Sequence, residues 1–197
     1  MNIGILASHR GSNFQAIVDA CNSGVLPARP VVVISNNSRA PVMARARSAG
    51  VPCVHLSSQT HPDPDALDDA MVDTFHRSGV DLIVTAGYMK KLGRRTLREY
   101  TGRIINVHPS LLPSHGGLGM YGIHVHRSVI SSGDRETGAT VHFVEQDYDT
   151  GPIIAQTRVL VCANDTPESL AERMLPVEHD LLIETLKTLG RRSELSC

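Results

Sequence analysis

Residues 2–24 read NIGILASHRGSNFQAIVDACNSG, and this stretch decides the fold. Its first part, NIGILA (2–7), is a short apolar run with branched residues, which is typical of a buried strand. The part from 12 to 24 has the apolar spacing of a helix and ends at a glycine. A strand that leads through a short loop into a helix is the repeating unit of α/β proteins with a parallel sheet.

The same alternation continues through the first half of the chain. Short apolar runs at 30–36, 52–56, 81–87 and 103–108 predict four more strands. Helical spacing at 42–50 and 65–79 predicts two further helices. Right-handed crossovers between parallel strands then give a Rossmann-like sheet with helices on both faces.

The second half has a different pattern. Residues 138–146 and 152–161 read as strands with no helix between them, which predicts an antiparallel hairpin or extension. A closing helix is expected over 166–190, where Pro176 should kink or split it. We therefore predict a single-domain α/β fold, a Rossmann-like, mostly parallel twisted sheet with antiparallel strands in the C-terminal half. Residues 1–190 form the predicted catalytic domain, and 191–197 form a C-terminal tail.

Composition narrows the class of protein. The chain has 197 residues, 41% of them hydrophobic, with a net charge of −1 and four scattered cysteines. It contains no apolar run near the roughly 20 residues that cross a bilayer, no basic stripe for nucleic acid and no signal peptide before the first strand. Cysteine, histidine and aspartate do not occur at metal-ligand spacing. These features predict a cytoplasmic protein without a metal, a membrane span or a nucleic-acid partner.

The first strand–helix loop, ASHRGSN (7–13), is a candidate anion site. A glycine-containing loop at a helix N-terminus presents free backbone N–H groups and the positive end of the helix dipole, which suits a phosphate. Gly11, Ser12 and Asn13 are the candidate contacts, with Arg10 as additional charge. The alternative is an ordinary turn in which Ser12 or Asn13 caps the helix.

The stretch INVHPSLLPS (105–114) carries the most specific polar pattern. Asn106 and His108 are two apart on a predicted strand, so they face the same side. Pro109 keeps His108 extended, and Pro113 stiffens the exit of the loop. An amide can donate to a developing oxyanion, and an imidazole can exchange a proton near neutral pH. The alternative is a polar strand end where both residues cap backbone groups.

A carboxylate is expected from EQDYDTGPI (145–153), between the last two strands. Asp149 in this loop can orient His108, raise its pKa and assist proton movement. The alternative is an aspartate that serves the turn alone, as the sequence DTGP permits.

Together these motifs resemble the folate-dependent formyltransferase family. The segments that carry the resemblance follow the family's order over nearly the whole chain: 2–17, AGYMKKL (86–92), INVHPSLLPS (105–114), ETGATVHFVEQDYDTGPIIAQ (136–156) and VEH (177–179). The resemblance implies transfer of a formyl group from 10-formyltetrahydrofolate, as co-substrate, to the primary amine of glycinamide ribonucleotide, in purine synthesis. The implied partners are these two small molecules, with a homodimer left open.

The resemblance also implies roles for matching positions. The catalytic residues would be Asn106, His108 and Asp149. Contacts to glycinamide ribonucleotide would come from Gly11, Ser12, Asn13 and Glu178. The folate would contact Met89, Lys90, Lys91, Leu92, Val144, Glu145 and Asp149. Thr140 and His142 would line the site.

Some positions depart from the family pattern. His9 and Arg10 replace smaller or neutral residues, Lys90 stands where arginine is common, and Pro64 lies near a position where some members use an arginine toward folate. The glycine-rich segment 114–127 is either a mobile lid or a surface insertion. Two other functions stay open: a formyltetrahydrofolate hydrolase, and a non-catalytic protein that binds folate or phosphate.

Overall fold

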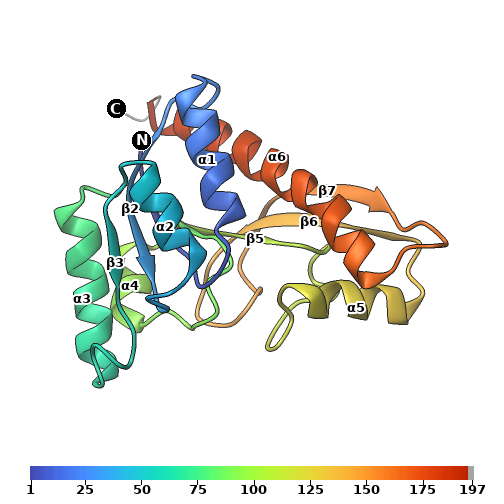
Figure 1. The fold of residues 1–197 in the computed structure, drawn as a ribbon, viewed down its shortest axis with the longest axis horizontal. Helices are drawn as coiled ribbons and strands as arrows, with labels where there is room; N and C mark the ends of the chain where they lie inside the picture. The colour runs from blue at the N-terminus through green and yellow to red at the C-terminus, as the bar shows by residue number, and fades with distance from the viewer. Residues whose placement is uncertain (195–197) are drawn as a thin grey trace.

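The structure is a computed structural model that describes the fold of residues 1–194 and the side chains of residues 1–191. One seven-stranded sheet is flanked by helices on both faces (Figure 1). The strands are β1 (Asn2–Leu6), β2 (Arg29–Ser35), β3 (Cys53–His55), β4 (Leu82–Thr85), β5 (Ile104–His108), β6 (Glu136–Phe143) and β7 (Ile153–Leu160). The helices are α1 (Ser12–Asn22), α2 (Pro41–Ser48), α3 (Pro64–Arg77), α4 (Arg94–Glu99), α5 (Ile123–Ser132) and α6 (Pro167–Glu194).

The strand order confirms the predicted fold class. The sheet runs β3-β2-β1-β4-β5-β6-β7, and its first five strands are parallel. The pairs β5–β6 and β6–β7 are antiparallel, as expected for the C-terminal half. Because β1 lies between β2 and β4, the winding direction reverses beside β1. Ligands of such sheets bind in the crevice at the carboxyl ends of the strands next to this point.

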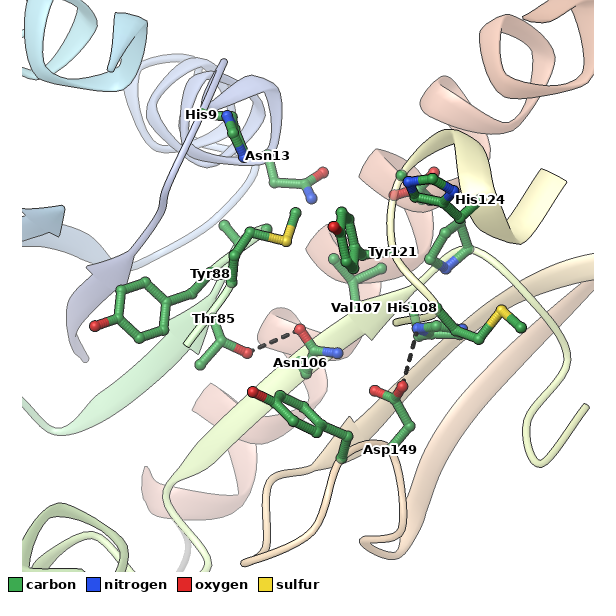
Figure 2. Close-up of a pocket in the computed structure, with 18 of the residues that line it drawn as sticks. His9, Asn13, Thr85, Tyr88, Asn106, Val107, His108, Tyr121, His124 and Asp149 are labelled. Carbon is green, nitrogen blue, oxygen red and sulfur yellow. Dashed lines mark hydrogen bonds and ion pairs between the residues drawn. The ribbon is translucent and has the colours of Figure 1, made fainter. Parts of the chain in front are cut away.

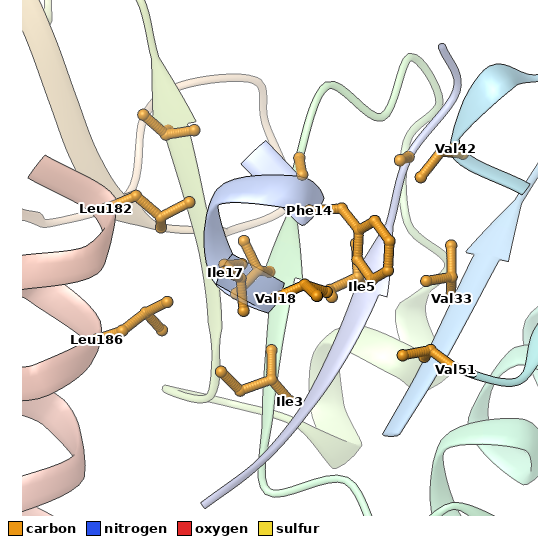
Figure 3. Close-up of a cluster of buried hydrophobic side chains, with 14 of the residues drawn as sticks. Ile3, Ile5, Phe14, Ile17, Val18, Val33, Val42, Val51, Leu182 and Leu186 are labelled. Carbon is orange, nitrogen blue, oxygen red and sulfur yellow. The ribbon is translucent and has the colours of Figure 1, made fainter. Parts of the chain in front are cut away.

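Successive residues of each strand supply two different cores. On one face, Ile5 and Val33 pack with Phe14 of α1, Val42 of α2 and Leu182 of α6 (Figure 3). This face explains why the apolar residues of α1 recur at helical spacing. The layer fixes the N-terminus of α1 beside the carboxyl end of β1.

The opposite face is covered by α3 and α4. Leu6 and Ile34 of the sheet are fully buried there against Phe75 and Tyr100. The two aromatic rings meet edge to face, with centroids 5.7 Å apart. Each strand in the middle of the sheet is therefore buried on both sides, which is why it reads as a continuous apolar run.

Helix α4 was not predicted from the sequence. Its six residues are too few for a clear periodic pattern, and its first N–H groups are capped from another helix. The Asp68 carboxylate of α3 accepts from Arg95 N–H (2.7 Å) and Thr96 N–H (3.1 Å). Gly93 is required here because a Cβ at this position would lie 2.1 Å from the Asp68 carboxylate.

Helix α5 was also missed, because the glycines before it suggested a loop through residue 127. Only residues 114–122 are irregular, and the helix begins at Ile123. Val125, His126 and Val129 form its buried face, and Gly133 ends it in the left-handed conformation (φ 68°). The second half of the predicted lid or insertion is therefore a helix packed beside α6 (Figure 1).

Helix α6 is longer and more continuous than predicted. Thr166 caps it as expected, since its Oγ1 accepts from Ser169 N–H (3.2 Å) while Ser169 Oγ accepts from Thr166 N–H (3.0 Å). Pro176 does not split the helix, because buried residues on both sides of it, Met174 and Leu182 among them, hold one continuous face against the sheet. Residues 191–194, the first part of the predicted tail, continue this helix, and 195–197 lie outside the described residues.

Among residues 1–194, none of the helices combines the length and the apolar character that crossing a bilayer requires.

Candidate active site

A cavity of about 930 Å³ opens at the carboxyl ends of β1, β4 and β5, where the winding reverses (Figure 2). Its walls come from the loops after these strands, from 117–124, from the loop between β6 and β7, and from α6. The predicted residues that line it are Gly11, Ser12, Asn13, Met89, Lys90, Lys91, Leu92, Asn106, His108, His142, Val144, Glu145, Asp149 and Glu178. The fold thus brings into one cavity residues that are up to 167 positions apart in the sequence (178 − 11).

Thr140 is the exception, because it does not line the cavity. It pairs with His108 across β5 and β6, but it is fully buried beneath the loop that follows β5. Its Oγ1 donates to Ser110 O (2.6 Å) and accepts from Leu112 N–H (3.1 Å). Thr140 was predicted to line the site. In the structure it instead hydrogen-bonds to the loop after His108 and holds that loop in place.

Asn106 is held at both ends of its amide. Thr85 Oγ1 donates to Asn106 Oδ1 (2.8 Å), and Asn106 Nδ2 lies 3.1 Å from His142 Nε2. His142 Nδ1 lies 2.8 Å from the Phe143 carbonyl, so Nδ1 carries the proton and Nε2 accepts from the amide. The amide nitrogen has a second N–H, and Asn106 lines the cavity.

His108 lies between two acceptors. Its Nε2 donates to the His115 carbonyl (2.9 Å), and its Nδ1 lies 3.6 Å from Asp149 Oδ2 (Figure 2). The pKa of His108 is lowered from its ordinary value, and burial is the largest cause. The Asp149 carboxylate and the His115 carbonyl raise the pKa, and the charges of His142 and His115 lower it. The expected effect of Asp149 is present, but burial outweighs it, so the neutral ring dominates near pH 7.

Asp149 has a backbone conformation that few residues adopt, with φ 58°. Aspartate tolerates this left-handed region better than most residues. Its Oδ2 accepts from Gly117 N–H (2.9 Å), and its Oδ1 lies 3.5 Å from His142 Nε2. Burial raises the pKa of Asp149, but the contacts with His142, His108 and the Gly117 N–H together lower it below its ordinary value. The carboxylate is therefore ionised between two imidazoles.

At the predicted anion site, no side chain caps the N-terminus of α1. Gly11 is the N-cap of α1 with φ 70°, and no side chain caps the helix, so the alternative of an ordinary cap by Ser12 or Asn13 is wrong. The first N–H groups of a helix have no partner within it. A Cβ at Gly11 would lie 2.5 Å from Val42 Cγ2, which excludes any larger residue. Arg45 Nε donates to Arg10 O (3.0 Å) and braces the loop.

The two segments predicted to hold the folate lie opposite each other. Lys91 Nζ pairs with Asp147 Oδ1 (3.1 Å) and lies 5.3 Å from the centre of the Tyr148 ring. The first segment is tied to the anion loop, because Met89 N–H donates to Ser8 Oγ (2.8 Å). The cavity therefore has one end at the N-terminus of α1, where the anion site is predicted, and a wide end between residues 89–92 and 144–149.

The protonation of one predicted residue of the cavity, and the positions of several others, were not predicted from the sequence. Burial raises the pKa of Glu178 to about 8, so this predicted contact is protonated at neutral pH. Thr85 is the last residue of β4, a strand that carries no polar motif, and Tyr88, whose pKa burial raises to about 12, follows that strand. Burial lowers the pKa of His126 to about 4, with the His108 charge as a second cause. His126 belongs to the unpredicted helix α5, so only its richness in histidine could have flagged it. Within the described part of the chain, no group of three Cys, His, Asp or Glu side chains is arranged to hold a metal.

Comparisons with known proteins agree with this geometry. The family model described as formyl transferase matches residues 1–186. A chloroplastic phosphoribosylglycinamide formyltransferase of Arabidopsis thaliana is 40% identical over 185 residues, which are 93% of this chain and 63% of that protein. This chain therefore spans less than two thirds of the length of the plant relative.

Solved structures give the same result. Glycinamide ribonucleotide transformylase 1 of Symbiobacterium toebii is 39% identical, with a TM-score of 0.91 over 97% of this chain and 88% of that chain. A formyltetrahydrofolate deformylase of Pseudomonas syringae is less similar, at 26% identity and a TM-score of 0.83 over 94% of this chain and 60% of that chain. The match over 1–186 covers both halves of the site, and the chain belongs to the formyl transferase family.

Proposed function

We propose that this protein transfers the formyl group of 10-formyltetrahydrofolate to the primary amine of glycinamide ribonucleotide, which gives the formylated ribonucleotide and tetrahydrofolate. One observation carries the proposal: the Asn106 amide, the His108 imidazole and the Asp149 carboxylate face one cavity between an anion loop and a wide cleft. The names of the Arabidopsis and Symbiobacterium relatives, a phosphoribosylglycinamide formyltransferase and a glycinamide ribonucleotide transformylase, support the same formyl acceptor.

In this proposal the ribonucleotide binds at the α1 end of the cavity. Its phosphate accepts from the backbone N–H groups of Gly11, Ser12 and Asn13, where the uncapped helix favours negative charge. Asn13 also has a buried side-chain oxygen without a partner in the described residues, which suits a donor group of the substrate. Glu178 lines the same cavity and contacts the glycinamide part.

The folate occupies the wide end. Met89, Lys90, Lys91 and Leu92 form one wall, while Val144, Glu145 and Asp149 lie on the other. Some members of the family use an arginine toward folate near position 64, and arginine is common at position 90. This chain has Pro64 and Lys90 instead, so Lys90 and Lys91 are the cations of this wall. This placement brings the formyl group to the junction of the two ends, beside Asn106.

The chemistry follows from the positions of the proposed catalytic residues. The amine attacks the formyl carbon, and negative charge develops on the formyl oxygen. The second N–H of Asn106 donates to that oxygen, because the first is used on His142. The amide does not reorganise during the reaction, since Thr85 and His142 hold both of its ends.

His108 accepts the proton from the amine and passes it on. Its Nε2–H is committed to the His115 carbonyl, so Nδ1, which faces Asp149, is the nitrogen that takes a proton from the attacking amine. The resulting imidazolium is stabilised by Asp149 and by the negative formyl oxygen. The proton passes to the folate nitrogen as its bond to the formyl carbon breaks. In this order His108 is neutral before the reaction, because burial lowers its pKa in the free protein.

The competing functions are separated by one incubation. The protein is mixed with 10-formyltetrahydrofolate labelled in the formyl carbon, with and without glycinamide ribonucleotide, and the labelled products are identified. We expect formylated ribonucleotide only when the ribonucleotide is present. Formate released at the same rate in both mixtures would indicate a hydrolase, in which water replaces the amine. No turnover in either mixture, with both ligands bound, would indicate a binding protein.

Four further assignments are predictions. Residues 1–190 are proposed as one catalytic domain, acting in the cytoplasm and without nucleic acid. The plant relative is named as chloroplastic, so a fluorescent fusion in the native cell tests the location. Sedimentation tests whether the protein forms a homodimer.

A further inference from the structure

His115 has an unusual combination of contacts. It is a non-glycine residue in the left-handed region, with φ 55°. Its carbonyl accepts the hydrogen bond from His108 Nε2 (2.9 Å). A residue in this conformation is strained, so the surrounding structure must hold it there.

The contacts that hold it come from the His115 ring. Its Nε2 lies 2.6 Å from Asp134 Oδ2, and its Nδ1 lies 2.8 Å from Ser128 Oγ. A carboxylate only accepts hydrogen bonds, so His115 Nε2 carries a proton. The Ser128 hydroxyl makes the second hydrogen bond of the ring, at Nδ1. The ring is largely buried, with 13% of its side chain exposed. Ser128 belongs to α5 and Asp134 follows it, so the ring anchors the segment before α5 to the helix itself.

The segment after β5 touches both members of the proposed acid–base pair. His115 presents its carbonyl to His108, and Gly117 N–H donates to Asp149 Oδ2 (2.9 Å). Gly116 packs so closely that a Cβ there would lie 3.3 Å from Asp149 Cβ. Moving residues 115–117 would therefore shift the partners of His108 and Asp149 together.

We propose that the Ser128–His115–Asp134 bridge is a positioning device that fixes the ring orientation and tautomer of His108. By holding the His115 carbonyl in place, it commits the proton of neutral His108 to Nε2 and leaves Nδ1 to face Asp149 and the cavity. The inference rests on the proposed function, in which His108 Nδ1 exchanges the proton. None of the three bridge residues needs to touch a substrate.

His115→Asn tests the bridge, because asparagine tolerates the left-handed backbone but cannot reach both partners. We expect kcat to fall about tenfold or more, the scale of a misplaced catalytic group, while KM for each substrate changes less than about twofold. In ¹⁵N NMR of the protein alone, neutral His108 should change from a single Nε2–H tautomer to a mixture. The titratable groups that act on His108, and that must be considered in reading its NMR signals, are Asp149, His142, His115 and His126.

Milder variants and a matched control complete the test. Asp134→Asn retains an oxygen that can accept from His115, so it should lose less activity than Asp134→Ala. His76→Asn is the control, because His76 Nε2 pairs with Glu99 Oε1 (3.1 Å) on the surface formed by α3 and α4, outside the cavity. It should change neither kcat nor the His108 spectrum.

The outcomes separate the bridge from the proposed function. Unchanged kcat, or an unchanged His108 tautomer, in both His115→Asn and Asp134→Ala would overturn the bridge even if His108→Ala abolished transfer. Full transfer activity in His108→Ala would instead overturn the proposed function. If His115→Asn does not fold, the comparison of Asp134→Asn with Asp134→Ala decides by the same two measurements.

Discussion

Asp149→Asn perturbs the proposed mechanism with the least structural change. Asparagine also tolerates φ near 58°, and its side-chain oxygen can still accept from Gly117 N–H. The substitution removes one negative charge that lies 3.6 Å from His108 Nδ1. At an effective dielectric constant of about 20, that charge is worth about 5 kcal/mol to a charged imidazole.

This figure is an upper limit, because His142 Nε2 lies 3.5 Å from the same carboxylate and shares its field. We expect the pKa of His108 to fall further when this charge is removed. The value is already lowered by burial, so the imidazolium becomes harder to form during the reaction. Transfer at neutral pH should slow by about 10²-fold in kcat, with little change in KM for the ribonucleotide.

The assay combines NMR titration of His108 with the pH profile of kcat. Asp147→Asn is the matched comparison, since it is the same substitution two residues away on an exposed side chain paired with Lys91. It should leave kcat and the pKa of His108 unchanged and alter only the KM for folate. An unaltered kcat and pH profile in Asp149→Asn would show that Asp149 serves the turn alone.

Three other perturbations have expected outcomes. Gly11→Ala combines a strained φ of 70° with a contact 2.5 Å from Val42 Cγ2, so the KM for the ribonucleotide should rise at least about tenfold while that for folate stays constant; equal effects on both would contradict the phosphate assignment. Thr85→Val removes the donor to Asn106 Oδ1 and should lower kcat about five- to tenfold in steady-state assays, without a change in Tm above a few degrees. Because the pKa of His126 is lowered to about 4, the unfolded chain protonates first as pH falls from 6.5, and stability is lost toward pH 4. Urea unfolding should show about 2 kcal/mol less loss between pH 7 and pH 5 in His126→Leu than in the wild type, and an equal loss in both would refute the shift.

The sequence predicted the sheet well because its central strands are buried on both faces, so short apolar runs mark them, and because β6 and β7 have no helix between them and pair antiparallel. Helix α4 was not predicted because its cap, Asp68, comes from another helix. Helix α5 was not predicted because glycines precede it. Asn106 and His108, at the end of a strand, and Asp149, in a loop, were predicted from their motifs, and all three line the cavity. The protonation of His108 was not predicted, because burial depends on neighbours that are distant in the sequence.

The same limit applies to the residues that support the site. Thr140 stands opposite His108 in the register of β6, yet the loop above it covers its hydroxyl. The bridge from His115 to Asp134 spans 19 positions with no motif, and it depends on how α5 packs. Spacing along a strand shows which side a residue faces, but only the folded chain shows what lies against it.

A double-mutant cycle on Asn106 and His108 tests the central claim most directly. Single-turnover rates of formyl transfer to the ribonucleotide are measured for the wild type, Asn106→Ala, His108→Ala and the double variant. If both side chains act on one formyl group, the double variant should be about as slow as the slower single variant. A double variant whose loss equals the product of the two single losses would contradict a shared site of action.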